Sequence, residues 1–129
     1  MDLYAEIILD HYKNPHHHGK LENPTVTFDD SNPLCGDKIH LELLLENGLI
    51  VDAAFSGEGC AISKASASML MDEIIGKSVE EVLGMTKENI FEMVGVPLSS
   101  ARVKCALLGF AAMKKMLRLG EEGRKSNKH

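Results

Sequence analysis

The chain has 129 residues, 44% of them hydrophobic and 26% charged, which is the balance of a globular domain with one core. Its formal net charge of −5 argues against a nucleic-acid partner, because phosphate binding needs a basic surface. No apolar run is long enough to cross a bilayer, and the first residues are acidic where a secretory signal would be basic. We therefore expect a cytoplasmic protein with no membrane partner and with reduced thiols.

The pattern predicts one domain over residues 1–120 and a flexible polar tail over residues 121–129. Residues 2–13 are expected to form an amphipathic helix that ends before Pro15, since the residue before a proline avoids the helical region. Strands are predicted over residues 25–28, 38–45 and 49–55. Asn47 and Gly48 favour a hairpin turn between the last two, so the front half should be a three-stranded antiparallel sheet.

Helices are predicted for the second half of the chain. One should begin after Cys60 and end at Gly76, where glycine is a natural stop. Ser78 and Thr86 are expected to cap two short helices, and a last helix should run from about residue 101 to about residue 119. A small antiparallel sheet packed against several helices is an α+β fold.

Each of the three cysteines is predicted at a junction between elements. Cys35 and Asp37 flank a glycine in a turn before a strand, Cys60 begins a helix, and Cys105 lies in the first turns of the last helix. Such positions favour side chains that are presented to a common point. Because a helix N-terminus lowers the pKa of a nearby thiol, we expect Cys60 and Cys105 to be activated, with Lys104 adding positive charge.

Three thiolates and one carboxylate suit Zn²⁺ in a tetrahedral site, and a thiolate-rich site also suits an iron–sulfur cluster. The Asp37 carboxylate, a hard ligand among soft sulfurs, should exchange most easily. Spacing alone leaves the question open. Cysteines 25 and 45 residues apart match no generic zinc template, and buried or unrelated thiols are the alternative.

Longer motifs surround these residues. Residues 32–37 read NPLCGD, residues 57–69 read GEGCAISKASASM, and residues 101–106 read ARVKCA. Together they resemble the U-type iron–sulfur cluster assembly scaffold family, whose branches are IscU, SufU and the N-terminal domain of NifU. Residues 4–15, YAEIILDHYKNP, are also similar to that family's opening, so the resemblance extends over nearly the whole chain.

This resemblance implies a SufE/NifU-like α+β fold with helices on one side of the sheet. It implies that Cys35, Asp37, Cys60 and Cys105 hold Zn²⁺ in a resting form and a 2Fe–2S cluster transiently. It also implies a cysteine desulfurase that delivers persulfide sulfur, with Cys105 as the first acceptor, and apo iron–sulfur proteins as recipients. A protein of this kind is a scaffold and sulfur acceptor, not an enzyme.

The branch within the family stays open. Residues 57–63 and 102–105 resemble SufU, but the insertion usual in SufU between the second and third cysteines is missing. The spacing is like that of IscU, yet VPLSS at residues 96–100 replaces the segment that the IscU chaperone recognises, so we expect no dedicated Hsp70-type partner. The alternative to a scaffold is therefore a zinc-dependent sulfur-transfer partner that activates a desulfurase without building clusters.

Other side chains that could carry chemistry are given structural interpretations. Consecutive histidines at residues 16–18 should not point the same way, so we expect a solvated loop. His40 should lie on the outer face of the sheet as a plain surface histidine. The methionines should fill the core. The serines at positions 63, 66 and 68 have no histidine base near them in sequence, which disfavours a hydrolase and favours close helix packing.

Overall fold

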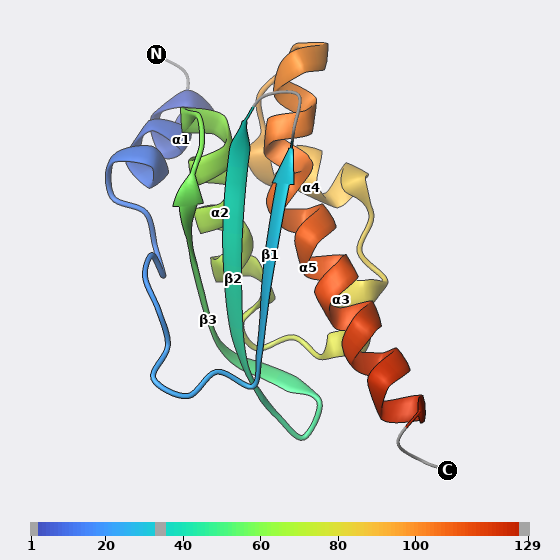
Figure 1. Ribbon diagram of the computed structural model, residues 1–129. Coiled ribbons are helices and arrows are strands. Elements are labelled where there is room, and N and C mark those ends of the chain that lie inside the picture. The colour runs from blue at the N-terminus through green and yellow to red at the C-terminus, as the bar shows by residue number, and fades with distance from the viewer. Residues whose placement is uncertain (1–2, 33–35, 127–129) are drawn as a thin grey trace.

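A computed structural model of the chain describes residues 3–32 and 36–126. In chain order the elements are α1 (Leu3–Lys13), β1 (Val26–Asn32), β2 (Asp37–Glu46), β3 (Leu49–Glu58), α2 (Ala61–Ile74), α3 (Val79–Leu83), α4 (Lys87–Val94) and α5 (Ser100–Ser126). The sheet forms one layer, and the helices of the second half of the chain cover one of its faces (Figure 1). This confirms the α+β fold expected from the sequence.

The sheet is antiparallel with the strand order β1-β2-β3. Asn47 and Gly48 join β2 to β3 with φ values of 53° and 79°, the left-handed conformation that a two-residue hairpin turn requires. Both outer strands are longer than predicted. The second half of β1, which reads DDSN, pairs with the start of β2, so ladder hydrogen bonds outweigh its low intrinsic strand propensity.

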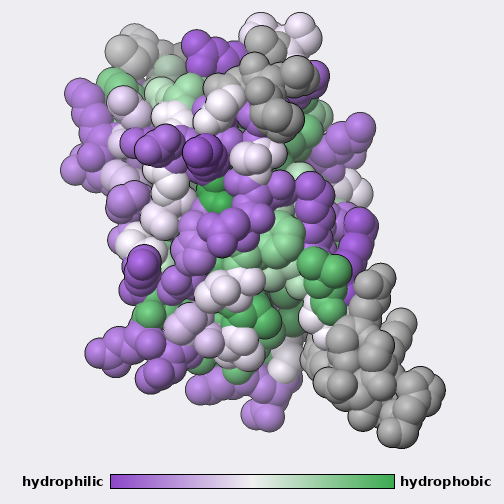
Figure 2. Space-filling model, viewed as in Figure 1, coloured by the Kyte–Doolittle hydropathy of each residue, from purple (hydrophilic) through white to green (hydrophobic). Residues whose placement is uncertain are grey.

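The core lies between the inner face of the sheet and helices α2 and α5. Ile39, Leu41 and Leu43 alternate along β2 and are buried, as a one-sided sheet requires. Met71 of α2 and Met113 of α5 are fully buried against them, which confirms the core interpretation for these methionines. The face of the molecule shown in Figure 2 is hydrophilic over the upper half of the sheet and carries apolar side chains over the lower half.

The helix ends follow the predicted capping chemistry. The Ser78 hydroxyl accepts a hydrogen bond from the Glu81 amide at 3.0 Å, and the Thr86 hydroxyl accepts one from the Asn89 amide at 3.4 Å. In both cases the third residue of the helix bonds back to the cap, which completes a capping box. Helix α5 continues to Ser126, past the predicted end at residue 119, although its extension contains Gly120 and Gly123, which are poor helix formers.

Several junctions meet at one end of the sheet, the upper end in Figure 1. Antiparallel pairing sets Asp37 opposite Asn32 and Lys38 opposite Glu58, so the start of β2 lies beside the end of β3. Helix α2 begins three residues after β3 ends, and α5 also begins at this end. Among the described residues, no helix is both long and apolar enough to span a membrane.

Candidate metal centre

Asp37, Cys60 and Cys105 come together at this end of the sheet. One carboxylate oxygen and the two sulfur atoms all lie within 4.8 Å of one another, and Cys60 Sγ is 4.0 Å from Asp37 Oδ2. The three residues come from the start of β2, the residue before α2 and the second turn of α5. The structure therefore brings together three of the four residues predicted as ligands. The fourth, Cys35, lies outside the described residues.

Cys60 is presented by the start of α2. It is the N-cap residue, with extended backbone (φ −75°, ψ 172°), and its side chain makes no cap hydrogen bond. Its carbonyl oxygen instead accepts hydrogen bonds from the Lys64 amide at 3.1 Å and the Ser63 hydroxyl at 3.0 Å. The backbone of the first helical turn thus holds Cys60 in place and leaves its sulfur directed toward Asp37 and Cys105.

Two glycines allow the close approach of the strands and the helix. Gly57 has φ +135°, and a Cβ added there would lie 2.2 Å from the Lys38 carbonyl oxygen. A Cβ added at Gly59 would lie 2.2 Å from Ser63 Oγ and 3.4 Å from the carboxylate of Asp37. A side chain at Gly57 would push β3 away from β2 beside Asp37, whereas one at Gly59 would require the Ser63 hydroxyl to turn away.

Burial differs among the three residues. Asp37 is 5% exposed and Cys105 is 7% exposed, whereas Cys60 is half-buried. The Asp37 carboxylate and the two thiols all carry negative charge when they are ionised. The site therefore brings groups of the same charge sign together in a region of low dielectric. Cys60 is the member of the set that solvent or another protein reaches most easily.

The two thiols respond to this setting in opposite ways. Burial acts to raise the pKa of Cys60, but the donors nearest its sulfur, on Ser63, Cys105 and the Ile62 amide, outweigh burial and hold that pKa below its ordinary value. Burial first, and then the neighbouring Cys60 and Asp37, raise the pKa of Cys105 to about 12. The expectation that both thiols are activated was therefore wrong for Cys105.

The donor set fits a metal cation. Two sulfurs and one carboxylate oxygen are ligands that Zn²⁺ accepts, and sulfur-rich sets also hold iron. Burial, and then the neighbouring Cys60 and Asp37, disfavour the Cys105 thiolate, and a cation bound there would offset these effects and favour the thiolate. Lys104, which was expected to supply positive charge, is exposed and lies outside this buried set.

Residues 16–18 form an exposed loop, as predicted, but the histidines make contacts that the sequence did not suggest. His16 and His17 both bind Asp72, through Nδ1 at 2.6 Å and Nε2 at 3.0 Å, so two consecutive rings do face the same group. The left-handed backbone of His17 (φ 59°) turns them to one side. His40 lies on the outer face of the sheet as predicted, but it bridges Asp29 at 2.9 Å and Glu42 at 2.8 Å instead of standing alone.

A histidine does accompany one of the serines. His11 of α1 lies with Nδ1 2.7 Å from Ser68 Oγ, a pairing of residues 57 apart that no local pattern could reveal. Ser68 is fully buried, and its hydroxyl also accepts the amide of His16 at 2.7 Å. A side chain without exposure cannot meet a substrate, so this pair fastens α1 and its following loop to α2.

The comparison with known proteins decides the family. The family described as NifU-like N terminal domain matches residues 3–121. The chain belongs to this family.

The named relatives include SufU and IscU proteins. The zinc-dependent sulfurtransferase SufU of Bacillus subtilis is 40% identical, over 94% of this chain and 93% of the relative. The iron–sulfur cluster assembly scaffold protein IscU of Thermotoga maritima is 36% identical, over 90% of this chain and 93% of the relative. The resemblance stated from the motifs is thereby confirmed.

Solved structures agree on the fold. The putative iron–sulfur cluster assembly scaffold protein for the SUF system of Fervidobacterium islandicum superposes with a TM-score of 0.77 at 33% identity, covering 87% of this chain and 94% of that one. The N-terminal NifU-like protein of Brucella abortus gives a TM-score of 0.76 at 24% identity and supports the fold alone.

Proposed function

We propose that this protein is an iron–sulfur cluster assembly scaffold that accepts sulfur from a cysteine desulfurase and assembles and hands on a 2Fe–2S cluster. The observation that carries the proposal is the convergence of Asp37, Cys60 and Cys105 within 4.8 Å at one end of the sheet. Relatives named as scaffold proteins at 30% identity or more support it. On this account the protein is not an enzyme in its own right.

In this proposal Asp37, Cys60 and Cys105 hold the metal, and Cys35, two residues before Asp37 in the sequence, is the fourth ligand. Bound Zn²⁺, the resting occupant, would supply the positive charge that brings the Cys105 thiol to its thiolate form. The half-buried Cys60 leaves the metal approachable from one side, and the burial of Asp37 and Cys105 limits access from the other. The 2Fe–2S cluster is the cargo of the same residues.

Sulfur transfer to Cys105 follows ordinary thiol–persulfide exchange. The Cys105 thiolate attacks the outer sulfur of the desulfurase persulfide and forms a new S–S bond. The sulfur–sulfur bond on the desulfurase breaks, and the electron pair leaves with the desulfurase cysteine as its thiolate. The exchange is balanced and requires no external oxidant. Since Cys105 is only 7% exposed, the donor must reach it past Cys60, the more open member of the site.

Asp37 is proposed to be the exchangeable ligand. A carboxylate oxygen binds soft metals less firmly than thiolate sulfur does, so its position is the first to open. Asp37→Ala should therefore slow transfer of a reconstituted cluster to an apo ferredoxin-type recipient. Asp52→Ala, in which a strand aspartate away from the site is removed, should transfer as fast as the wild type. Equal transfer rates for Asp37→Ala and wild type would show that Asp37 has another role.

A second candidate function is favoured by the relative named zinc-dependent sulfurtransferase. In that case the protein would bind zinc, take sulfur and activate a desulfurase without building clusters. Reconstitution with iron, cysteine and a desulfurase separates the two candidates. A scaffold should yield a visible chromophore on this chain that passes to an apo acceptor. A sulfurtransferase should raise the turnover of the desulfurase in proportion to bound zinc and leave the chain colourless.

A further inference from the structure

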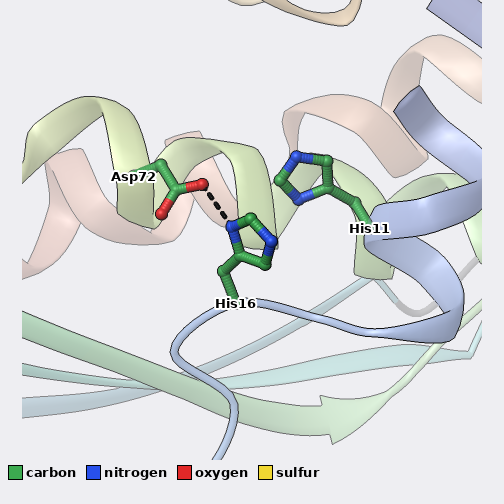
Figure 3. Close-up of side chains that lie close together, drawn as sticks. All are labelled: His11, His16 and Asp72. Atoms are coloured by element: carbon green, nitrogen blue, oxygen red, sulfur yellow. Dashed lines mark hydrogen bonds and ion pairs between the residues drawn. The ribbon is translucent and has the colours of Figure 1, made fainter.

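A second group of metal-binding side chains lies apart from the cysteine site. His11 of α1, His16 of the following loop and Asp72 of α2 each offer one ligand atom, and these atoms lie within 4.8 Å of one another. Figure 3 shows the three side chains converging from three separate segments of the chain. None of them is a candidate ligand of the cysteine site that carries the proposed scaffold function.

The group is held in place by hydrogen bonds. The His11 ring is positioned by Ser68, whose fully buried hydroxyl lies 2.7 Å from His11 Nδ1. The His16 ring is positioned by Asp72, whose carboxylate accepts a hydrogen bond from Nδ1 at 2.6 Å. The two imidazole rings lie 4.4 Å apart between centroids. The two rings therefore already lie side by side in the folded protein.

The second ring nitrogen of His16, Nε2, is directed toward His11. Because Nδ1 of His16 donates to Asp72, the lone pair of the neutral ring is on Nε2. Figure 3 shows that this second nitrogen lies on the side of the ring that faces His11. A carboxylate bonded to the far nitrogen of a metal-bound histidine is the usual support for such a ligand, since it sets the ring orientation and raises its basicity.

The charge of the group also suits a cation. Asp72 brings a negative charge, and its other oxygen accepts a hydrogen bond from His17 Nε2 at 3.0 Å. Imidazole donors select divalent ions such as Zn²⁺, Ni²⁺ and Cu²⁺ over Mg²⁺ or Ca²⁺.

We propose that His11 and His16 bind a divalent transition-metal ion of the Zn²⁺ class, with Asp72 as the carboxylate that orients His16, and that this second site joins α1 and its loop to α2. This goes beyond the scaffold function, because the site uses no cysteine. Bound metal would fasten the N-terminal helix to the helix that begins at Cys60. The protein would then hold one ion at its cysteines and another at its histidines.

The test is a calorimetric titration of the metal-free, untagged protein with Zn²⁺ at pH 7.5. His16→Gln removes a proposed ligand, and Asp72→Asn removes the carboxylate that orients it. His18→Gln is the matched control, because His18 belongs to the same loop and packs edge-on against Phe55 instead of facing Asp72. Cys60→Ser disables the cysteine site, so that the two sites are counted separately. Circular dichroism of each variant verifies that it is folded.

The proposal predicts one equivalent of Zn²⁺ that is lost in both His16→Gln and Asp72→Asn and kept in His18→Gln and Cys60→Ser. In Cys60→Ser, Zn²⁺ should also slow amide exchange in α1, and adding His16→Gln should abolish that effect. If no equivalent is sensitive to His16→Gln or Asp72→Asn, the second site does not exist. Failure of the cysteine site would appear differently, as the absence of any equivalent sensitive to Cys60→Ser.

Discussion

Replacing Gly57 by alanine tests how closely the strands approach at the metal centre. Gly57 has φ +135°, and an added Cβ would lie 2.2 Å from the Lys38 carbonyl oxygen, about 1.2 Å short of the 3.4 Å at which ordinary contact begins. Lys38 follows Asp37, and Glu58 and Gly59 separate Gly57 from Cys60. The clash therefore acts between the two segments that carry candidate ligands.

The expected cost has two parts. The left-handed backbone penalises alanine by about 1–2 kcal/mol relative to glycine. The clash adds about 1–3 kcal/mol, the usual range for forcing an extra methyl group into a packed site. Gly48→Ala is the matched control, because Gly48 also has a positive φ (79°) but an added Cβ would meet nothing within 4 Å. Gly48→Ala should incur only the cost of the left-handed backbone.

Urea denaturation measures the difference. Gly57→Ala should lower the free energy of unfolding by about 1–3 kcal/mol more than Gly48→Ala does. Competition with a chromophoric chelator should show zinc affinity reduced by about tenfold or more in Gly57→Ala alone, because ligand sets tolerate displacements of only about 0.5 Å. Equal loss of stability in the two variants, with equal zinc affinity, would refute the close approach of β3 to β2 on which the site depends.

Three further predictions concern His40, the cap of α3 and Lys104. Hydrogen bonding to Glu42, and secondarily to Asp29, raises the pKa of His40 above 6.5 against the opposing effect of burial. The stability that His40 adds should therefore be complete below about pH 6.5 and lost as the pH rises through the pKa of the folded protein. The free energies of unfolding of wild type and His40→Gln, measured with urea, should converge between about pH 6 and pH 8. A difference that stays constant over this range would contradict the prediction. Ser78→Ala removes the cap of α3 and should cost about 1 kcal/mol in the same assay, whereas no change would mean that the capping box is not formed in solution. Lys104→Glu should weaken cluster assembly by less than about fivefold, because an exposed charge is screened, and Lys87→Glu, at the start of α4, should leave it unchanged. Identical assembly by both lysine variants would remove Lys104 from the account.

Local patterns predicted most of the fold because the local chemistry and the tertiary structure agree. The Asn47–Gly48 turn, the Ser78 and Thr86 caps and the alternation along β2 each carry their own signal. The polar end of β1 carries none, since residues 29–32 become a strand only by pairing with the start of β2. Such pairing depends on a segment several residues away and cannot be read from composition.

The candidate site was also predicted only in part. The position of each cysteine at an element junction was visible in the sequence, and the structure brings Asp37, Cys60 and Cys105 together. The raised pKa of Cys105 was not visible, because burial and the charges of Cys60 and Asp37 arise only after folding. The facing of His16 and His17 was missed for a related reason: nothing in the sequence indicates the left-handed backbone of His17.

The metal content of the purified protein tests the central claim most directly. Zinc and iron per chain should be measured for untagged protein purified without oxygen, in a His16→Gln background so that only the cysteine site is counted. The account predicts close to one equivalent of metal in that protein and almost none when Cys60→Ser is added. Equal metal content with and without Cys60, or none in either, would contradict a metal centre built on Asp37, Cys60 and Cys105 and the scaffold function proposed from it.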